Sequence, residues 1–187
     1  ACIERKTRET RVRIKINLDG RGDASIRTPI RFFNHLLEAF AKHGCFDLAV
    51  EAEGDLPHHI AEDVMIVLGT ALEKALGDKM GIERMGEAII PMDDALVLVS
   101  VDLSGRAYCD IRCAFRKKML DDLSSDLFVH LLQSFSSNAR LNLHVDVLRG
   151  KNDHHKAEAV FKALGVALRR ATRSLPKRKV VSTKGVV

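Results

Sequence analysis

Histidines and glutamates recur along this chain in a pattern that could bind metal ions. Residues 58–75 (HHIAEDVMIVLGTALEKA) align without gaps with residues 154–171 (HHKAEAVFKALGVALRRA), and more than half of the positions are identical. A second match, FFNHLLEAF (32–40) with LFVHLLQSF (127–135), places a histidine opposite a histidine. The repeated polar residues are His35, His58, His59 and Glu62 in the first half, and His130, His154, His155 and Glu158 in the second.

The spacing of these residues suits two metal ions. Residues four apart share a helix face, so His58 or His59 can converge with Glu62 on one ion. Adjacent side chains diverge by about 100° on a helix, so a His-His pair serves two ions better than one. Neutral imidazole and carboxylate favour borderline divalent ions such as Mn, Fe, Zn, Co or Ni. Histidines that only begin helices or fill a core do not explain a repeat in register. We therefore predict a pair of metal sites built from up to eight ligands.

The elements that would position these ligands follow the same order in both halves. Alternating apolar residues predict strands, and apolar residues at helical spacing predict helices. In the first half we expect strands at 11–18 and 23–28, a helix at 29–44 ending at Gly44, a strand at 45–54 and a helix at 58–78. In the second half we expect a hairpin of 95–103 with 106–115, a helix at 126–139, a strand at 139–150 and a helix at 154–173. The sequence predicts an α+β fold of two ββαβα repeats, at about 9–78 and 94–173, packed as one unit and followed by a basic, irregular tail at 174–187.

Composition places the chain among soluble globular proteins. It has 187 residues, of which 46% are hydrophobic and 29% charged. No apolar run of about 18 residues predicts a membrane span, and the charged opening segment does not resemble a secretory signal. The four cysteines show no CxxC spacing, which disfavours thiolate metal sites and disulfides. We expect a protein of the reducing cytoplasm.

The basic charge of the chain indicates an anionic partner. The formal net charge is +5. The chain has eight Phe, one Tyr and no Trp, too few aromatic residues for a platform on which nucleic-acid bases stack. A phosphorylated small molecule explains the charge better, and we expect no nucleic acid partner. Two alternatives stay open on the residues alone: a binuclear metallo-phosphoesterase, and an RNA-binding protein of ribosomal S5-like fold. The second leaves the eight repeated ligands unexplained.

Nearly the whole chain resembles one enzyme family, imidazoleglycerol-phosphate dehydratase of histidine biosynthesis. The matching segments include RKTRET, INLDGRG, FFNHLLEAFAKHGCFDL, HHIAEDV, PMDDAL, DLSGRA, GKNDHHKAEAVFKA and the terminal STKG. The resemblance implies a duplicated fold like the second domain of ribosomal protein S5. It also implies trimers assembled into a 24-subunit shell and two Mn(II) ions per active site, located between subunits. The implied reaction dehydrates imidazoleglycerol phosphate to imidazoleacetol phosphate.

The resemblance also implies a role for each matching residue. The eight repeated histidines and glutamates would be the metal ligands. Residues at phosphate-binding positions are Arg84, Arg106, Lys162, Ser182 and Lys184. Residues near the glycerol and its proton transfers are Glu9, His43 and Asp93, with Glu9 the first choice for acid–base catalysis and His43 the second.

The sequence departs from the family pattern in three places. The GDLPHHIAED segment is three residues shorter than usual, Asp94 replaces a glutamate, and Ala39 stands where many relatives have glutamine. None of these departures removes an expected metal ligand.

Overall fold

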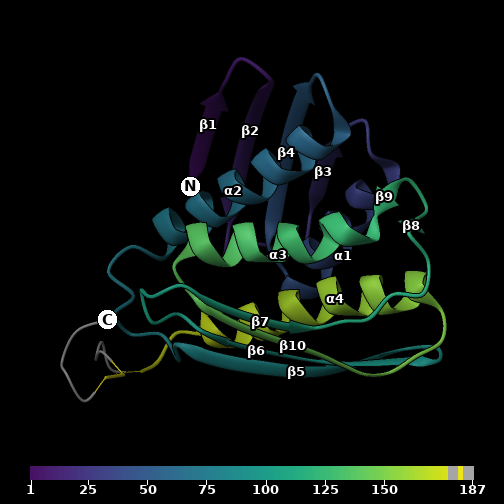
Figure 1. Ribbon diagram of the computed structural model, residues 1–187. Coiled ribbons are helices and arrows are strands. Elements are labelled where there is room, and N and C mark those ends of the chain that lie inside the picture. The colour runs from purple at the N-terminus through teal and green to yellow at the C-terminus, as the bar shows by residue number, and fades with distance from the viewer. Residues whose placement is uncertain (177–180, 183–187) are drawn as a thin grey trace.

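The computed structural model describes residues 1–176 and 181–182. These residues form two four-stranded β-sheets with helices between them (Figure 1), and one short two-stranded sheet. The first half contains β1 (Cys2–Lys6), β2 (Thr10–Asn17), β3 (Ala24–Arg27), α1 (Arg31–Gly44), β4 (Asp47–Gly54) and α2 (Pro57–Leu76). The second half contains β5 (Met85–Met92), β6 (Ala95–Asp102), β7 (Tyr108–Arg112), β8 (Met119–Leu120), β9 (Leu123–Ser124), α3 (Ser125–Ala139), β10 (Asn142–Arg149) and α4 (Asp153–Ala171). No helix among the described residues combines the length and apolar character needed to cross a membrane.

The predicted α+β fold of two repeats is confirmed, but each repeat begins with a strand that was not expected. These strands are β1 and β5, which precede the predicted ββαβα order in each half, and the second half also contains the short unpredicted hairpin of β8 and β9. Four of the five residues of β1 are exposed, so this edge strand lacks the alternation of apolar residues that marks a half-buried strand. β5 lies in the 78–94 connection, in which the sequence had predicted no regular element.

The predicted hairpin of 95–103 with 106–115 is wrong, and β2 does not pair with β3 either, because the strand between the two helices of each repeat enters the middle of its sheet. The strand orders are β1-β2-β4-β3 and β5-β6-β10-β7. β3 therefore pairs in parallel with β4, and β7 pairs in parallel with β10. In the first sheet the Asp47 carboxylate accepts hydrogen bonds from the N–H groups of Arg21 and Asp23 at 2.8 and 3.2 Å. These bonds fix the 18–23 loop onto β4 instead of closing a turn between β2 and β3.

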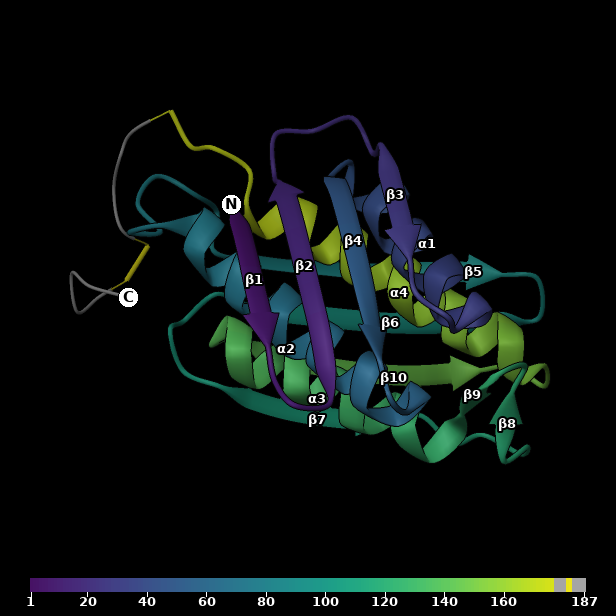
Figure 2. The same ribbon diagram turned by 90° about the horizontal axis from the view of Figure 1, so that it is seen from above.

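The helices of the two repeats pack against each other rather than within their own repeat. α2 covers β2 of the first sheet and α4 covers β5 and β6 of the second, while α1 packs on α4 and α2 packs on α3. Figure 2 shows the strands of one sheet crossing over those of the other, with the helices between them. Phe40 of α1 and Phe135 of α3 meet edge-to-face in this layer, with ring centroids 6.4 Å apart and both side chains fully buried. The core thus spans both repeats, as expected for helices that bury one face on a sheet and another on a helix.

Two glycines in equivalent positions of the repeats allow these close helix contacts. A Cβ atom on Gly165 of α4 would lie 2.4 Å from the carbonyl oxygen of Phe40 in α1. A Cβ atom on Gly69 of α2 would lie 2.6 Å from the carbonyl oxygen of Phe135 in α3. Each glycine therefore brings a helix of one repeat against the backbone of a helix from the other.

Gly165→Ala is expected to destabilise the protein, although alanine normally favours a helix over glycine by about 1 kcal/mol. The added methyl group would overlap the α1 backbone, and such overpacking typically costs about 1–3 kcal/mol. Denaturant unfolding measures the change. Thr70→Ala, at an exposed position of α2, is the control and should change the free energy of unfolding much less. Equal or greater stability of Gly165→Ala would show that the helices are not in close contact.

Candidate metal centre and active site

One cluster of predicted ligands lies between α1 and α4. His35 Nε2 is 3.3 Å from Glu158 Oε2, and His154 Nε2 is 3.5 Å from the same oxygen. Glu158 is nearly buried, with 8% of its side chain exposed, whereas both imidazoles are partly open to solvent. The cluster thus has a buried carboxylate at its base and two histidines at its mouth.

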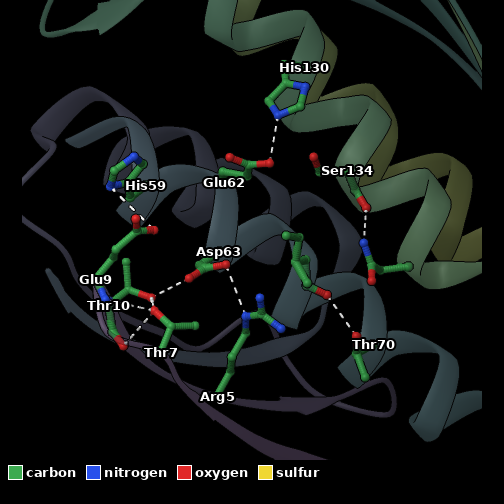
Figure 3. A network of polar contacts seen from close by, with 12 residues as sticks. Arg5, Thr7, Glu9, Thr10, His59, Glu62, Asp63, Thr70, His130 and Ser134 are labelled. Carbon is green, nitrogen blue, oxygen red and sulfur yellow. Dashed lines mark hydrogen bonds and ion pairs between the residues drawn. The ribbon is translucent and has the colours of Figure 1, made fainter. Parts of the chain in front are cut away.

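A second cluster lies between α2 and α3. His58 Nε2 is 3.7 Å from Glu62 Oε2, and His130 Nε2 is 2.9 Å from Glu62 Oε1. Figure 3 shows Glu62 and His130 pointing toward each other from facing helices. The His58 and His130 rings are stacked, with centroids 6.1 Å apart.

Each cluster combines residues of both repeats. The same ligand types recur in each half of the sequence, but the three ligands of one cluster do not all come from one half. The single histidine on α1 joins the His-x-x-x-Glu pair of α4, and the single histidine on α3 joins the equivalent pair of α2. The cause is the packing of α1 on α4 and of α2 on α3.

The remaining histidine of each His-His pair points away from its cluster, as predicted from helix geometry. The rings of His58 and His59 are 6.0 Å apart and nearly perpendicular, at 89°. Those of His154 and His155 are 6.1 Å apart at 88°. A single chain therefore brings six of the eight predicted ligands into these two cross-repeat clusters. His59 lies instead in a third group of possible metal ligands with Glu9 and Asp55, and His155 belongs to none of the three groups found among the described residues.

His59 and His155 both lie beside carboxylates. His59 Nδ1 is 2.9 Å from Asp55 Oδ1 and 3.8 Å from Glu9 Oε2. The hydrogen bond with Asp55 raises the pKa of His59 and lowers the pKa of Asp55. His155 Nδ1 is 2.8 Å from Asp94 Oδ1, and its Nε2 is 3.4 Å from Asp93 Oδ2.

Asp94 fits its position although it replaces the family's glutamate. Its Oδ2 accepts hydrogen bonds from the backbone N–H groups of Lys151 and Asn152. The bond from Lys151, followed by the bond with His155, lowers the pKa of Asp94 well below its ordinary value. An ionised Asp94 thus fixes both His155 and the start of α4.

The donor atoms fit divalent metal ions. Within each cluster the three ligand atoms lie within 4.8 Å of one another. Two ligands of one ion are separated by at most about twice a metal–ligand bond, roughly 4–4.4 Å. The measured separations from carboxylate to imidazole are below this limit, so small side-chain rotations suffice to bind an ion. Imidazole and carboxylate in this ratio suit the borderline transition metals.

A shallow hollow of about 410 Å³ lies beside the first cluster. His35, Ala39, His43, Glu158 and Lys162 are among the residues that line it. Lys162 Nζ is 2.7 Å from Glu158 Oε1. Burial, and then the nearby Lys162 cation, lower the pKa of His43, which favours a neutral imidazole. The hollow thus places His43 and Lys162 near one candidate metal site.

Two of the other predicted phosphate-binding residues, Arg84 and Arg106, have their polar contacts outside both clusters. Arg84 donates to both carboxylate oxygens of Asp102, at 2.7 and 3.0 Å, and to the carbonyl oxygen of Val181. Arg106 is exposed in the loop after β6. Within the described part of the chain, neither arginine forms a hydrogen bond or ion pair with a cluster member. Ser182 is described next to Val181, and Lys184 lies outside the described residues.

The structure adds carboxylates that the sequence reasoning missed. Buried Asp63 accepts hydrogen bonds from Thr10 Oγ1 and from Arg5 Nε, and so fixes the β1–β2 turn that carries Glu9 (Figure 3). Asp121 Oδ2 is 2.7 Å from His154 Nδ1. Asp63 directly follows the predicted ligand Glu62, so the sequence could have identified it as a residue near the site. Asp121 is far from His154 in sequence, and no sequence pattern connects the two.

Comparison with known proteins agrees with the geometry. The family model for imidazoleglycerol-phosphate dehydratase matches residues 28–168. The imidazoleglycerol-phosphate dehydratase of Dehalococcoides mccartyi is 49% identical over 189 residues, covering 100% of this chain and 96% of that protein. That of Chloroflexus aggregans is 51% identical over 192 residues, covering 100% of this chain and 94% of that protein.

Solved structures show the same similarity along the chain. The crystal structure of IGPD from Pyrococcus furiosus in complex with (S)-C348 superposes with a TM-score of 0.87 at 39% identity, covering 99% of this chain and 100% of that chain. The imidazoleglycerol-phosphate dehydratase of Staphylococcus aureus gives a TM-score of 0.83 at 34% identity, covering 93% and 99%. This chain therefore belongs to the imidazoleglycerol-phosphate dehydratase family, and it is a hydro-lyase that converts imidazoleglycerol phosphate to imidazoleacetol phosphate in histidine biosynthesis.

Proposed function

We propose that this dehydratase uses two Mn(II) ions per active site, bound by the two clusters. The observation that carries the proposal is the presence of two equivalent groups of imidazoles around a carboxylate, each formed across the repeats. Bound Mn(II) would act as a Lewis acid that withdraws charge from the imidazole ring of the substrate. Family membership sets aside the phosphoesterase and RNA-binding alternatives, because neither class catalyses this dehydration.

The net reaction requires groups that transfer protons. One hydroxyl leaves the glycerol carbon beside the imidazole ring and one hydrogen leaves the next carbon, together giving water and an enol that becomes the ketone. We assign Glu9 as the main acid–base group, with His43 and Asp93 as further candidates. Glu9 and Asp93 each lie beside a histidine that points away from its own cluster. This position supports a role at a site completed by another subunit.

The cationic residues would bind the substrate phosphate. Lys162 lies at the edge of the hollow beside the first cluster. Arg84 is oriented by Asp102, and its Nη1 donates to the carbonyl oxygen of Val181 in the tail. Guanidinium groups recognise phosphate oxygens in pairs. Together with Arg106, Ser182 and Lys184, these residues form the proposed phosphate site.

Self-association would complete the metal sites. The carboxylates beside His59 and His155 hydrogen-bond Nδ1 of each ring, which favours Nε2 as a metal-binding atom. We propose that these two histidines reach the clusters of neighbouring subunits in a 24-subunit particle built from trimers, located in the cytoplasm. Metal affinity then contributes to the association energy.

The purified protein is expected to contain about two manganese ions per chain after growth with manganese, because each chain supplies two clusters of three donors. Elemental analysis measures this content, and an ultraviolet assay follows the ketone product. Removal of the metal with a chelator should abolish turnover and convert the particle to trimers, as seen by light scattering. Full activity and an unchanged particle mass in excess chelator would contradict the proposal.

A further inference from the structure

Asp121 occupies an unusual backbone position beside a candidate metal ligand. It lies in the two-residue turn between β8 and β9 with a φ of 55°, a left-handed conformation that non-glycine residues rarely adopt. Its carboxylate oxygen Oδ2 is 2.7 Å from Nδ1 of His154. The strained position therefore brings a carboxylate to the side of His154 opposite the cluster.

The segment that carries Asp121 is anchored at both ends. Leu120 and Leu123 on either side of the turn are buried, at 2% and 1% exposure. Before the turn, the N–H groups of Arg116 and Lys117 donate to buried Asp153 at 2.8 and 2.9 Å. After it, Ser125 N–H donates to the carbonyl oxygen of Lys118 at 3.0 Å. The Asp121 carboxylate is thus held by the fold and not by its contact with His154 alone.

The same turn also fixes the helix that carries the other histidine of this cluster. Asp122 accepts hydrogen bonds from the N–H groups of Arg31 and Phe32, at 2.7 and 2.9 Å, and so caps α1. The ring of Phe32 lies 4.6 Å from that of His154. One turn therefore sets the position of His35 through its helix and the position of His154 through its ring.

The contact has a defined chemical effect on His154. A carboxylate that accepts a hydrogen bond from Nδ1–H favours the tautomer in which Nε2 has a free electron pair. Nε2 of His154 is the atom that faces Glu158, at 3.5 Å. In the other cluster, the ion pair of His58 with Glu62 uses Nε2, and no described carboxylate bonds its Nδ1. The two clusters have the same types of ligand. Among the described residues, only the cluster of α1 and α4 has a carboxylate bonded to Nδ1 of the histidine that its His-His pair contributes.

We propose that Asp121 is a positioning residue that fixes the ring orientation and tautomer of His154, so that the cluster of α1 and α4 binds its metal ion more tightly. The proposal rests on the metal sites proposed above. Loss of such a supporting carboxylate typically costs about 10–100-fold in metal affinity. The Asp121 and His154 side chains are 58% and 41% exposed. An exposed contact of this kind adds little to folding stability, so the effect should fall on the metal site.

Two substitutions separate the carboxylate from the backbone conformation. Asp121→Asn keeps a residue that tolerates the left-handed conformation, and Asp121→Gly favours that conformation. Mn(II) binding to the full-length protein is measured by equilibrium dialysis. Both variants are expected to keep one site of parental affinity and to weaken the other by about 10–100-fold. Asp126→Asn, which removes a charge from an exposed position in the first turn of α3, is the control and should bind both ions like the parent.

A double-mutant cycle with His154→Ala tests whether Asp121 acts through His154. In the His154→Ala background, Asp121→Asn should cause no further loss of affinity, because the hydrogen bond is already absent. The ¹⁵N spectrum of histidine-labelled, metal-free protein should show the Nδ1–H tautomer at His154 in the parent and a tautomer mixture in Asp121→Gly.

The outcomes distinguish this inference from the proposed function. A parent protein that binds no Mn(II) would overturn the metal sites themselves. A parent that binds two ions, with Asp121→Asn and Asp121→Gly binding them equally well, would overturn only the role of Asp121. Equal losses in the Asp126→Asn control would show a general charge effect and would also overturn it.

Discussion

Glu9→Gln is expected to lower turnover by roughly two to four orders of magnitude, the usual contribution of general acid–base catalysis. The substitution keeps the size of the side chain but removes its ability to exchange a proton. Metal content and particle mass should stay at parental values, because Glu9 belongs to neither of the two cross-repeat clusters. Steady-state kinetics with imidazoleglycerol phosphate measure the loss.

The structure gives Glu9 a fixed position. The N–H of Glu9 donates to Thr7 Oγ1 at 3.1 Å, and Thr10 Oγ1 donates to the buried carboxylate of Asp63 (Figure 3). The β1–β2 turn is therefore tied to α2, the helix that carries Glu62. A side chain with 58% exposure on a fixed backbone suits a group that meets substrate at a subunit boundary.

Two comparisons make the Glu9 result specific. Glu4→Gln changes a carboxylate of the same hairpin that forms a surface ion pair with Arg11, and it should leave turnover unchanged. His43→Ala tests the second candidate for the acid–base role. If Glu9→Gln turns over normally and His43→Ala does not, the main acid–base group is His43.

Glu158→Gln is expected to abolish tight metal binding at the cluster of α1 and α4 and to destabilise the protein. The expected loss of Mn(II) affinity exceeds about 100-fold, the upper end of the cost of losing a supporting residue. Stability should also fall, because Lys162 would lose its charged partner at 2.7 Å. A hydrogen bond to a charged group contributes about 1.5–3 kcal/mol. Denaturant unfolding of the metal-free protein measures this loss separately from metal binding.

The repeat supplies a matched control for Glu158. Glu62 is the equivalent residue on α2, and the position equivalent to Lys162 is Ile66. Glu62→Gln should therefore weaken metal binding at its own cluster to a similar extent. It should cost less stability, since the ion pairs of Glu62 are with His58 and His130.

A second substitution separates the two effects of Glu158→Gln. Adding Lys162→Met removes the unpaired cation and should restore part of the lost stability, because an apolar side chain of similar length replaces a desolvated charge. Metal affinity should stay low. Recovery of metal binding in the double variant would show that Glu158 only neutralises Lys162 and is not a ligand.

The sequence alone determined the chemistry and the local structure. The aligned HHxxE motifs identified the ligand types, and helical spacing predicted that adjacent histidines diverge, as the near-perpendicular rings of His58 and His59 confirm. The predicted helices appear within a few residues of their expected ends. α1 ends at Gly44 as expected, but the residue that adopts the left-handed conformation after it is Cys45, with a φ of 55°. Helix ends and the directions of adjacent side chains depend on residues that are close together in the sequence. A sequence pattern therefore predicts them.

Only the tertiary structure decided which residues share a site. His35 and Glu158, or Glu62 and His130, are far apart in sequence, and nothing local to either residue selects its partner. The selection follows from the packing of α1 on α4 and of α2 on α3, where Gly165 and Gly69 allow close approach. The same long-range packing inserts β4 and β10 into the middle of the sheets and brings Asp121 to His154. The two metal clusters depend on a core formed by both repeats, and the other contacts join segments of one repeat that are far apart in sequence, so local sequence patterns specify neither.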